Sequence, residues 1–480
     1  MGFHLKSALR KDGQEQPGIK MGIFTFRLPF IHYPFEMPEM IQALFMFVTG
    51  LAATAFLQDM FDMPFEIALT IVLFHEISYC LHQTLGDPLI SGWITPAVPL
   101  TIGFLSKYAM GIDRLEALIA LQICVGIIFL VLGFSGLAKK LTTWLPNSIK
   151  SGVIMGAAIA AVIGKYGFLP AAAGGKGFAL YPYSITAGMV IAFFLLFSNG
   201  FKRMRSKATL GSMVNIVAKY GMVPGIIGGM LVGFITKEVP LPTIDNWGFF
   251  VPQFGTVFSD WSIIGLGLPS FHVFISALPM AVVAYIVAFG DVVVGETLMK
   301  RANKLRPDEY IDINTNRTNV ICGIRNMFEG LLSPTVTLAG PLWAAMTVAV
   351  TERYTQGKTA MLSIFGGTAT FNIMKFVCIL FLPLISIFKP VLPLAIALTL
   401  MVQAFACFFI ALEMVETSEE RGVAGITAAI LAVSGAAYGL AAGLILYFLI
   451  QKIGLKTSKP SPVEETVFTN DSVSMESYQE

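Results

Sequence analysis

A few ionisable side chains lie inside otherwise apolar stretches of this 480-residue sequence, where a charge is costly and is often kept for function. A carboxylate in such a place can take up a proton or Na⁺, and Asp291 is the best candidate for that coupling role. The alternative for Asp291 is a helix-end carboxylate that faces Lys300 or Arg301. For Glu296 that alternative is the favoured one. Lys375, a lone cation in its stretch, could balance an acid or attract an anion.

Two more pairs of ionisable residues interrupt apolar stretches. His75 and Glu76 are adjacent, so they could carry a coupling proton, although a buried hydrogen-bonded pair is the favoured interpretation. The next histidine is His82, so the HExxH spacing of a zinc site is absent and no metal site is expected. Arg325 and Glu329 are four residues apart on one expected helix, which predicts a structural ion pair.

A ten-residue pattern occurs once in each half of the chain. Residues 91–100 read SGWITPAVPL and residues 333–342 read SPTVTLAGPL, so both follow S-x-x-[IV]-T-x-A-x-P-L. Ile94-Thr95 and Val336-Thr337 favour extended backbone, and the proline that follows can occupy the first turn of a helix. Two helix N-termini that face each other would bind an anion or a polar acceptor. The alternative is two proline-kinked helices with chance similarity.

The composition indicates what surrounds these residues. Hydrophobic residues make up 55% of the chain and charged residues 13%, and the mean hydropathy is +0.73. A soluble domain carries about 25% charged residues. These values exclude a water-soluble enzyme, a nucleic-acid-binding protein and a disordered chain, which leaves a polytopic membrane protein. We expect it in a lipid bilayer, as in a bacterial inner membrane.

A spanning helix needs about 20 apolar residues, and fourteen segments are expected to span, several of them short. They lie near 37–58, 64–82, 91–106, 113–137, 146–166, 181–198, 220–237, 269–298, 318–332, 334–351, 360–383, 388–413, 421–434 and 436–452. With the N-terminus in the cytoplasm, most of the 32 Lys and Arg residues fall on the inside. This bias supports fourteen spans with both ends cytoplasmic.

Seven expected spans separate the two copies of the pattern, so the copies face opposite sides of the membrane. That is the arrangement of an inverted-topology repeat, whose substrate site lies near the midplane. The substrate-binding residues predicted on this basis are Thr95, Pro96, Ala97, Val98, Thr337, Leu338, Ala339 and Gly340.

The remaining sequence features indicate little further chemistry. The five cysteines lie in apolar runs without CxxC spacing, so neither disulfides nor metal ligands are expected, and no cofactor is implied. The first 36 residues contain no short apolar segment before a cleavage site, so no removable signal peptide is expected. The polar tail is expected to be disordered.

At these motifs the chain resembles the nucleobase/ascorbate and sulfate permease superfamily, which includes uracil, sulfate and benzoate carriers. Residues 40–45 (MIQALF) are similar to the start of the first span of nucleobase permeases. Residues 88–97 (PLISGWITPA) resemble the third span of sulfate and benzoate carriers, and Phe289-Gly290-Asp291 resembles the Gly-Asp of the eighth span of nucleobase permeases.

The resemblance implies an all-α membrane protein with a 7+7 inverted repeat, in which a core domain (spans 1–4 and 8–11) moves against a gate domain (spans 5–7 and 12–14). Substrate would lie between the extended parts of spans 3 and 10, closed by Thr49 and Gly50 of span 1 and Val287 of span 8. The expected parts are a cytoplasmic N-terminal segment (1–36), core repeat one (37–141), gate repeat one (142–240), an external loop (241–267), core repeat two (268–384), gate repeat two (385–452) and a disordered cytoplasmic tail (453–480).

The sequence also departs from the nucleobase permeases. Their tenth span carries Asn-x-Gly, where this chain has Ala339-Gly340-Pro341, and a glutamate of their eighth span is Val287 here. We therefore expect a non-enzymatic secondary active transporter of a small anionic or polar solute, coupled to H⁺ or Na⁺. The alternatives are a nucleobase:cation symporter of the same fold and an uncoupled anion exchanger or channel. A homodimer is among the partners that the sequence allows.

Overall fold

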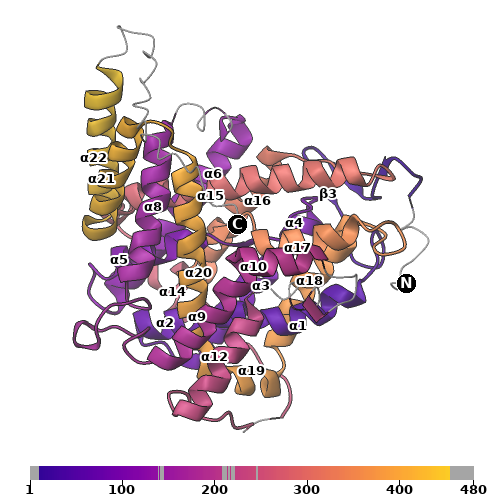
Figure 1. Cartoon of the computed structure of the whole chain (residues 1–480), viewed down its shortest axis with the longest axis horizontal. Helices are drawn as coiled ribbons and strands as arrows, with labels where there is room; N and C mark the ends of the chain where they lie inside the picture. The colour runs from indigo at the N-terminus through magenta and orange to yellow at the C-terminus, as the bar shows by residue number, and fades with distance from the viewer. Residues whose placement is uncertain are drawn as a thin grey trace, which may run out of the picture.

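The computed structural model describes residues 10–138, 140, 145–207, 213–214, 217, 222–244 and 247–453 (Figure 1). The first nine residues, and the tail expected to be disordered from residue 454 onward, lie outside this part of the chain. Within it the structure is built mostly from helices, as the sequence predicted.

The helices follow the expected segments closely. In the first half they are α1 (Met37–Leu51), α2 (Ala53–Phe61), α3 (Phe65–Ser78), α4 (Cys80–Thr84), the 3₁₀ turn η2 (Thr95–Ala97), α5 (Val98–Leu105), α6 (Ile112–Ser135), α8 (Asn147–Ile163), η3 (Ala171–Ala173), α9 (Pro182–Phe197), α10 (Asn199–Lys207) and α12 (Val223–Thr236). In the second half they are α13 (Phe254–Asp260), α14 (Ile263–Leu266), α15 (Phe271–Leu305), α16 (Thr315–Leu332), α17 (Ala344–Tyr354), α18 (Ile364–Ile379), α19 (Leu382–Phe388), η4 (Lys389–Val391), α20 (Leu392–Glu413), α21 (Ser418–Ser434), α22 (Ala436–Leu446) and the π-helical turn η5 (Tyr447–Lys452).

In the part of the chain that the structure describes, five helical segments are long and apolar enough to cross a membrane, which makes the chain an integral membrane protein. They are Met37–Phe61, Phe65–Thr84, Ile112–Ser135, Phe271–Leu305 and Leu382–Glu413. The pair α9 and α10, bent by 54°, would add a sixth. Each of the fourteen expected segments contains helical residues, but the number of crossings stays a prediction.

Local sequence explains where several helices begin. Pro182 occupies the first turn of α9, where its missing N–H costs nothing. The side chain of Asn314 accepts hydrogen bonds from the first backbone N–H groups of α16. Thr417 and Glu420 form a reciprocal capping box at the start of α21. These polar caps satisfy N–H groups that apolar surroundings would leave unpaired.

The helices pack in two groups, and each group mixes the two halves of the sequence. In one group α1 packs against α18, and α6 packs against α15 and α16. In the other, α8 packs against α20 and α21, while α9 packs against α12 and α20. Figure 1 shows α8, α21 and α22 at one end of the molecule and α1, α17 and α18 at the other. Early and late segments are therefore neighbours throughout.

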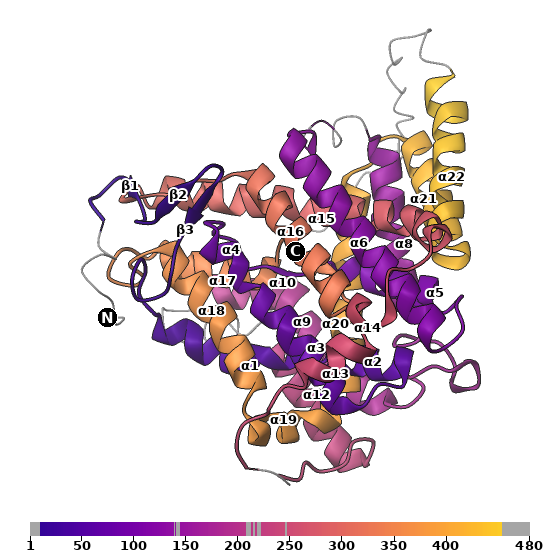
Figure 2. The same ribbon diagram turned by 180° about the vertical axis from the view of Figure 1, so that it is seen from behind.

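The described residues form three small two-stranded sheets, two of which connect distant parts of the chain. β2 (Ile19–Met21) and β3 (Phe24–Phe26) form an antiparallel hairpin near the N-terminus. β1 (Gln14–Glu15) pairs in parallel with β5 (Glu309–Tyr310), which lies between α15 and α16. The third sheet pairs β4 (Gly92–Trp93) with β6 (Ala339–Gly340) and belongs to the candidate site. Figure 2 shows the N-terminal strands on the side of α4, away from α21 and α22.

Ion pairs fasten the N-terminal segment to the chain beyond α15. The Arg10 guanidinium lies 2.8 Å from Asp308 and 3.4 Å from Glu309 and donates to the carbonyl of Leu362 at 2.6 Å. The Arg306 guanidinium, hydrogen-bonded to Asp308, holds the pKa of that carboxyl below its usual range. Burial raises the pKa of Glu309. Arg10 thus ties the N-terminal segment to the loop after α15 and to the loop before α18.

We predict that Arg10→Ala lowers the apparent free energy of unfolding by about 1–3 kcal/mol, because buried acceptors lose a charged donor. The measurement is thermal unfolding of the purified protein in detergent. Lys11→Ala is the matched control, since Lys11 is exposed. Identical melting of the Arg10→Ala variant and the wild type would contradict this assignment of Arg10.

Candidate functional site

Two short extended segments from opposite halves of the chain meet at the candidate site. β4 and β6 run antiparallel, with Gly92 opposite Gly340 and Trp93 opposite Ala339. A Cβ atom on Gly340 would lie 2.6 Å from the backbone of Trp93, so this approach requires glycine. The structure therefore brings the two copies of the ten-residue pattern into direct contact.

The extended residues are not those that the sequence predicted. Ile94-Thr95 and Val336-Thr337 were expected to be extended, but Thr95 begins η2, and Val336 and Thr337 form a turn. Leu338 follows this turn with a φ of 49°. Pro341 precedes α17 by three residues and is not in its first turn. The glycines, not the β-branched residues, permit the close strand pairing.

Side chains of α16 hold the second segment in place. The Asn326 amide donates to the carbonyl of Ala339 at 2.7 Å and accepts from the N–H of the same residue at 2.9 Å. Arg325 donates to the carbonyl of Gly340 at 2.9 Å. Extended backbone inside a membrane is tolerated only when protein or a water-filled cavity satisfies it. Asn326 and Arg325 supply those partners.

A buried network continues behind this segment. Gln122 on α6 accepts from the N–H of Thr335 at 2.9 Å and donates to Glu329 at 2.9 Å. The Glu329 carboxylate also lies 2.9 Å from Nδ1 of His75 and 3.9 Å from Nε of Arg325. The four side chains are fully buried. One carboxylate thus connects α3, α6 and α16 around the strand.

A second buried ion pair lies beside the first. Lys375 Nζ is 2.8 Å from a carboxylate oxygen of Glu76, and both side chains are at most 1% exposed. The ammonium group also lies over the rings of Tyr79 and Trp343, at 4.5 and 4.7 Å from their centroids. A Cβ atom on Gly50 would lie 2.2 Å from the other oxygen of Glu76. The glycine therefore gives this carboxylate its space against α1.

A narrow hollow separates η2 from the second group of helices. Thr95 and Pro96 line it from one side and Gln403 from the other. Its complete lining is Thr95, Pro96, Pro99, Ala157, Ala158, Ala161, Leu400, Gln403, Ala404 and Cys407. The Gln403 amide donates to the sulfur of Cys407 at 3.4 Å. The lining contains no ionisable carboxylate or amine.

The other predicted substrate residues are not part of the lining of this hollow. Ala97, Val287 and Leu338 share one buried apolar cluster with residues of α8. Val98 belongs to the neighbouring apolar cluster. The hydroxyl group of Thr49 donates to the backbone of its own helix. Thr337 forms a hydrogen bond with the nearby Thr335.

Asp291 lies well inside α15, about 21 Å along the axis from the last residue of that helix at 1.5 Å per residue. It forms no hydrogen bond or ion pair with any residue that the structure describes, and it lies within electrostatic range of Cys407. The coupling role of Asp291 stays a prediction. Glu296 pairs with Lys300 at 2.6 Å, one turn further along α15.

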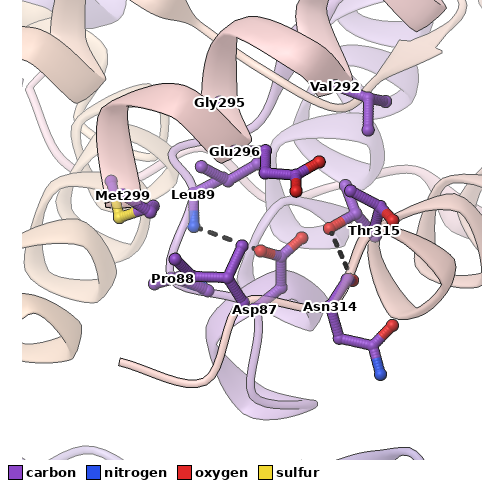
Figure 3. A pocket seen from close by; sticks show the side chains of 11 residues that line it. Asp87, Pro88, Leu89, Val292, Gly295, Glu296, Met299, Asn314 and Thr315 are labelled. Carbon is purple, nitrogen blue, oxygen red and sulfur yellow. Dashed lines mark hydrogen bonds between the residues drawn. The ribbon is translucent and has the colours of Figure 1, made fainter. Parts of the chain in front are cut away.

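A second cavity lies between α15, the loop after α4 and the start of α16 (Figure 3). Figure 3 shows Glu296 from α15 and Asp87 from the loop bordering it together with Asn314 and Thr315. Asp87 pairs with His82 at 2.8 Å, and Glu296 pairs with Lys300. Both acids thus have partners already. Among the described residues no group of three or more His, Cys, Asp or Glu could hold a metal ion.

Sequence reasoning missed three amide side chains that the site uses. Gln122 and Asn326 satisfy the backbone of the second segment, and Gln403 lines the hollow. The sequence analysis searched the apolar stretches for charged residues only. Asn and Gln inside spans also form hydrogen bonds across helices, and this signal could have identified them.

No family model and no curated protein matches this chain, whereas solved structures do. The transmembrane domain of a cyanobacterium bicarbonate transporter, BicA, covers 86% of this chain and 99% of its own, with 14% identity and a TM-score of 0.50. SLC26A9 covers 86% of this chain with 14% identity and a TM-score of 0.51, and the match spans 65% of that protein. A structure of the murine Slc26a9 anion transporter in the inward-facing state covers 87% of this chain and 68% of its own, with 14% identity and a TM-score of 0.47.

The chain has the fold of the BicA transmembrane domain. At the level of the fold, this confirms the resemblance to the permease superfamily that the sequence motifs indicated. At 14% identity the likeness extends to the arrangement of the helices and not to individual side chains.

We predict that Gly50→Ala destabilises the protein, because the added methyl group would collide with Glu76 and displace it from Lys375. A buried ion pair that loses its geometry typically costs about 3–5 kcal/mol. Thermal unfolding in detergent measures the effect. Gly422→Ala on α21 is the matched control, because a Cβ atom there meets nothing within 4 Å. Equal destabilisation by both substitutions would contradict the role of Gly50.

Proposed function

We propose that this protein is a secondary active transporter that moves a small anion across the membrane by alternating access. The observation that carries the proposal is the pairing of β4 and β6 beside a narrow hollow, within a fold that a bicarbonate transporter shares. The anion binds between Thr95–Val98 and Thr337–Gly340, where η2 and α5 begin. The positive end of the α5 helix dipole favours an anion there.

The proposed mechanism divides the chain into the core and gate domains that the sequence implied, within fourteen spans. The two packing groups support this division, because α1, α6, α15, α16 and α18 form one group and α8, α9, α12, α20 and α21 the other. The hollow lies where η2 of the first group faces α8 and α20 of the second. Sliding of one group past the other would open that hollow to each side in turn.

Ion pairs between loops support the proposed sidedness. Segments assigned to the cytoplasm contact one another, as in the pair Lys358–Asp12 at 2.7 Å. Segments assigned to the outside also meet, because Lys165 lies 2.6 Å from Asp59, which Lys176 and Tyr166 contact as well. Each contact requires its two segments to lie on the same side of the membrane.

Asp291 is the proposed coupling residue. No described residue pairs with Asp291, which lies one turn after Val287 of the cluster that contains Ala97 of η2, whereas Glu76 is held by Lys375 and Glu296 by Lys300. A carboxylate inside a membrane protein is expensive to keep charged and alone. A proton or Na⁺ would offset that cost and could bind together with the anion.

The deciding experiment is uptake of a panel of anions into proteoliposomes, with and without an imposed gradient of H⁺ or Na⁺. We expect uptake of at least one small anion to accelerate in a cation gradient. Absence of flux for every anion would overturn the proposed function. Flux that no gradient changes would instead identify an uncoupled exchanger or channel.

We predict that Asp291→Asn abolishes the dependence of uptake on the cation gradient, because the amide removes the charge and keeps the shape. The measurement compares initial rates in the presence and absence of the gradient. Glu296→Gln is the matched control on the same helix and should retain the dependence, since Glu296 pairs with Lys300 at 2.6 Å. If only Glu296→Gln lost the dependence, the coupling role would belong to Glu296, in the cavity that it lines with Asp87.

A further inference from the structure

The charges around the extended pair determine which anions the site can hold. Two cations lie near it, and each already faces a carboxylate. Lys375 is 2.8 Å from Glu76, and Arg325 is 3.9 Å from Glu329. All four side chains are at most 1% exposed, so water screens these pairs little. Among the described residues next to β6, the charge of each buried cation is therefore balanced by a carboxylate, although Nη2 of Arg325 has no hydrogen-bond partner.

The hollow itself adds polar groups but no positive charge. Its polar side chains are Thr95 on the η2 side and Gln403 and Cys407 on the α20 side. The Gln403 amide is directed to a weak acceptor, the Cys407 sulfur, at 3.4 Å. A bound anion would be a better acceptor for that donor. Asp291 follows Val287 by one turn of α15, and Val287 shares a buried apolar cluster with Ala97 of η2 and Leu338.

We infer that this site takes a singly charged anion together with one monovalent cation and discriminates against doubly charged anions. The inference rests on the proposed function, because it concerns the substrate class of the same site. The bound cation cancels the charge of a singly charged anion. The local charge of the loaded site therefore equals that of the empty site with Asp291 ionised. A second negative charge on the anion would have no partner.

The cost of dehydrating an ion explains why this difference is large. The electrostatic cost of moving an ion from water into a low-dielectric site rises with the square of its charge, so a doubly charged anion pays roughly fourfold more than a singly charged one of the same size. A neutral donor such as the Gln403 amide offsets part of the smaller cost. To offset the larger dehydration cost of a doubly charged anion, the site would need an unpaired Arg or Lys. The described site lacks one.

The test measures proteoliposome flux of anions that are matched in shape but differ in charge. Perchlorate and sulfate are one pair, and ¹⁴C-labelled oxamate and oxalate are another, with protein-free liposomes subtracted. We expect the singly charged member of each pair to be transported at least about tenfold faster at equal concentration. Equal or faster flux of sulfate and oxalate would overturn the inference and leave the proposed function standing. Absence of all flux would overturn both.

A charge added at the hollow provides an independent test. Gln403→Lys places an unpaired cation beside Thr95, so the ratio of sulfate to perchlorate flux should rise at least about tenfold. Gln403→Met is the matched control, because it keeps the length of the side chain without charge and should leave the preference for singly charged anions in place. An unchanged ratio in a Gln403→Lys protein that still transports perchlorate would overturn the inference.

Discussion

The structure depends on one requirement, which is that every backbone N–H and C=O group inside the membrane finds a partner within the protein. Helices satisfy this requirement alone, but β4 and β6 do not. Their remaining polar groups are satisfied by each other and by the amide and guanidinium groups of Asn326 and Arg325. The Gln122 amide serves the turn that precedes β6. A non-helical site in this chain therefore brings with it a polar network that reaches three helices.

The same network explains why so many charges are buried in so apolar a chain. Arg325 serves the carbonyl of Gly340, and Glu329 holds His75 and Gln122 while balancing that cation. A buried charge that supports the backbone needs a counter-charge beside it. Such a paired charge is then not free to bind substrate. What remains for binding is a hollow with neutral polar groups and one carboxylate nearby. The paired charges that support the extended backbone therefore also determine which anions the site is proposed to accept.

Much of the fold could be predicted from the sequence, because lipid imposes long apolar segments that are visible as hydropathy. The repeated pattern also located the contact between the halves, since Gly92 and Gly340 lie within its two copies. The exact extended residues could not be predicted, because strand pairing is decided by a close approach between backbones 248 residues apart in sequence. The partners of Glu76 and Glu329 were hidden for the same reason, since Lys375 and His75 come from other helices.

The attachment of the N-terminal segment has a consequence for how motion in this protein can be observed. β1 and Arg10 hold the start of the described chain to the loops beside α15 and α18, whereas α22 at its end packs against α21 and α8. The two ends of the described chain therefore belong to different packing groups. If the groups slide as proposed, the distance between a spectroscopic label on the β2–β3 hairpin and one near η5 would change during transport.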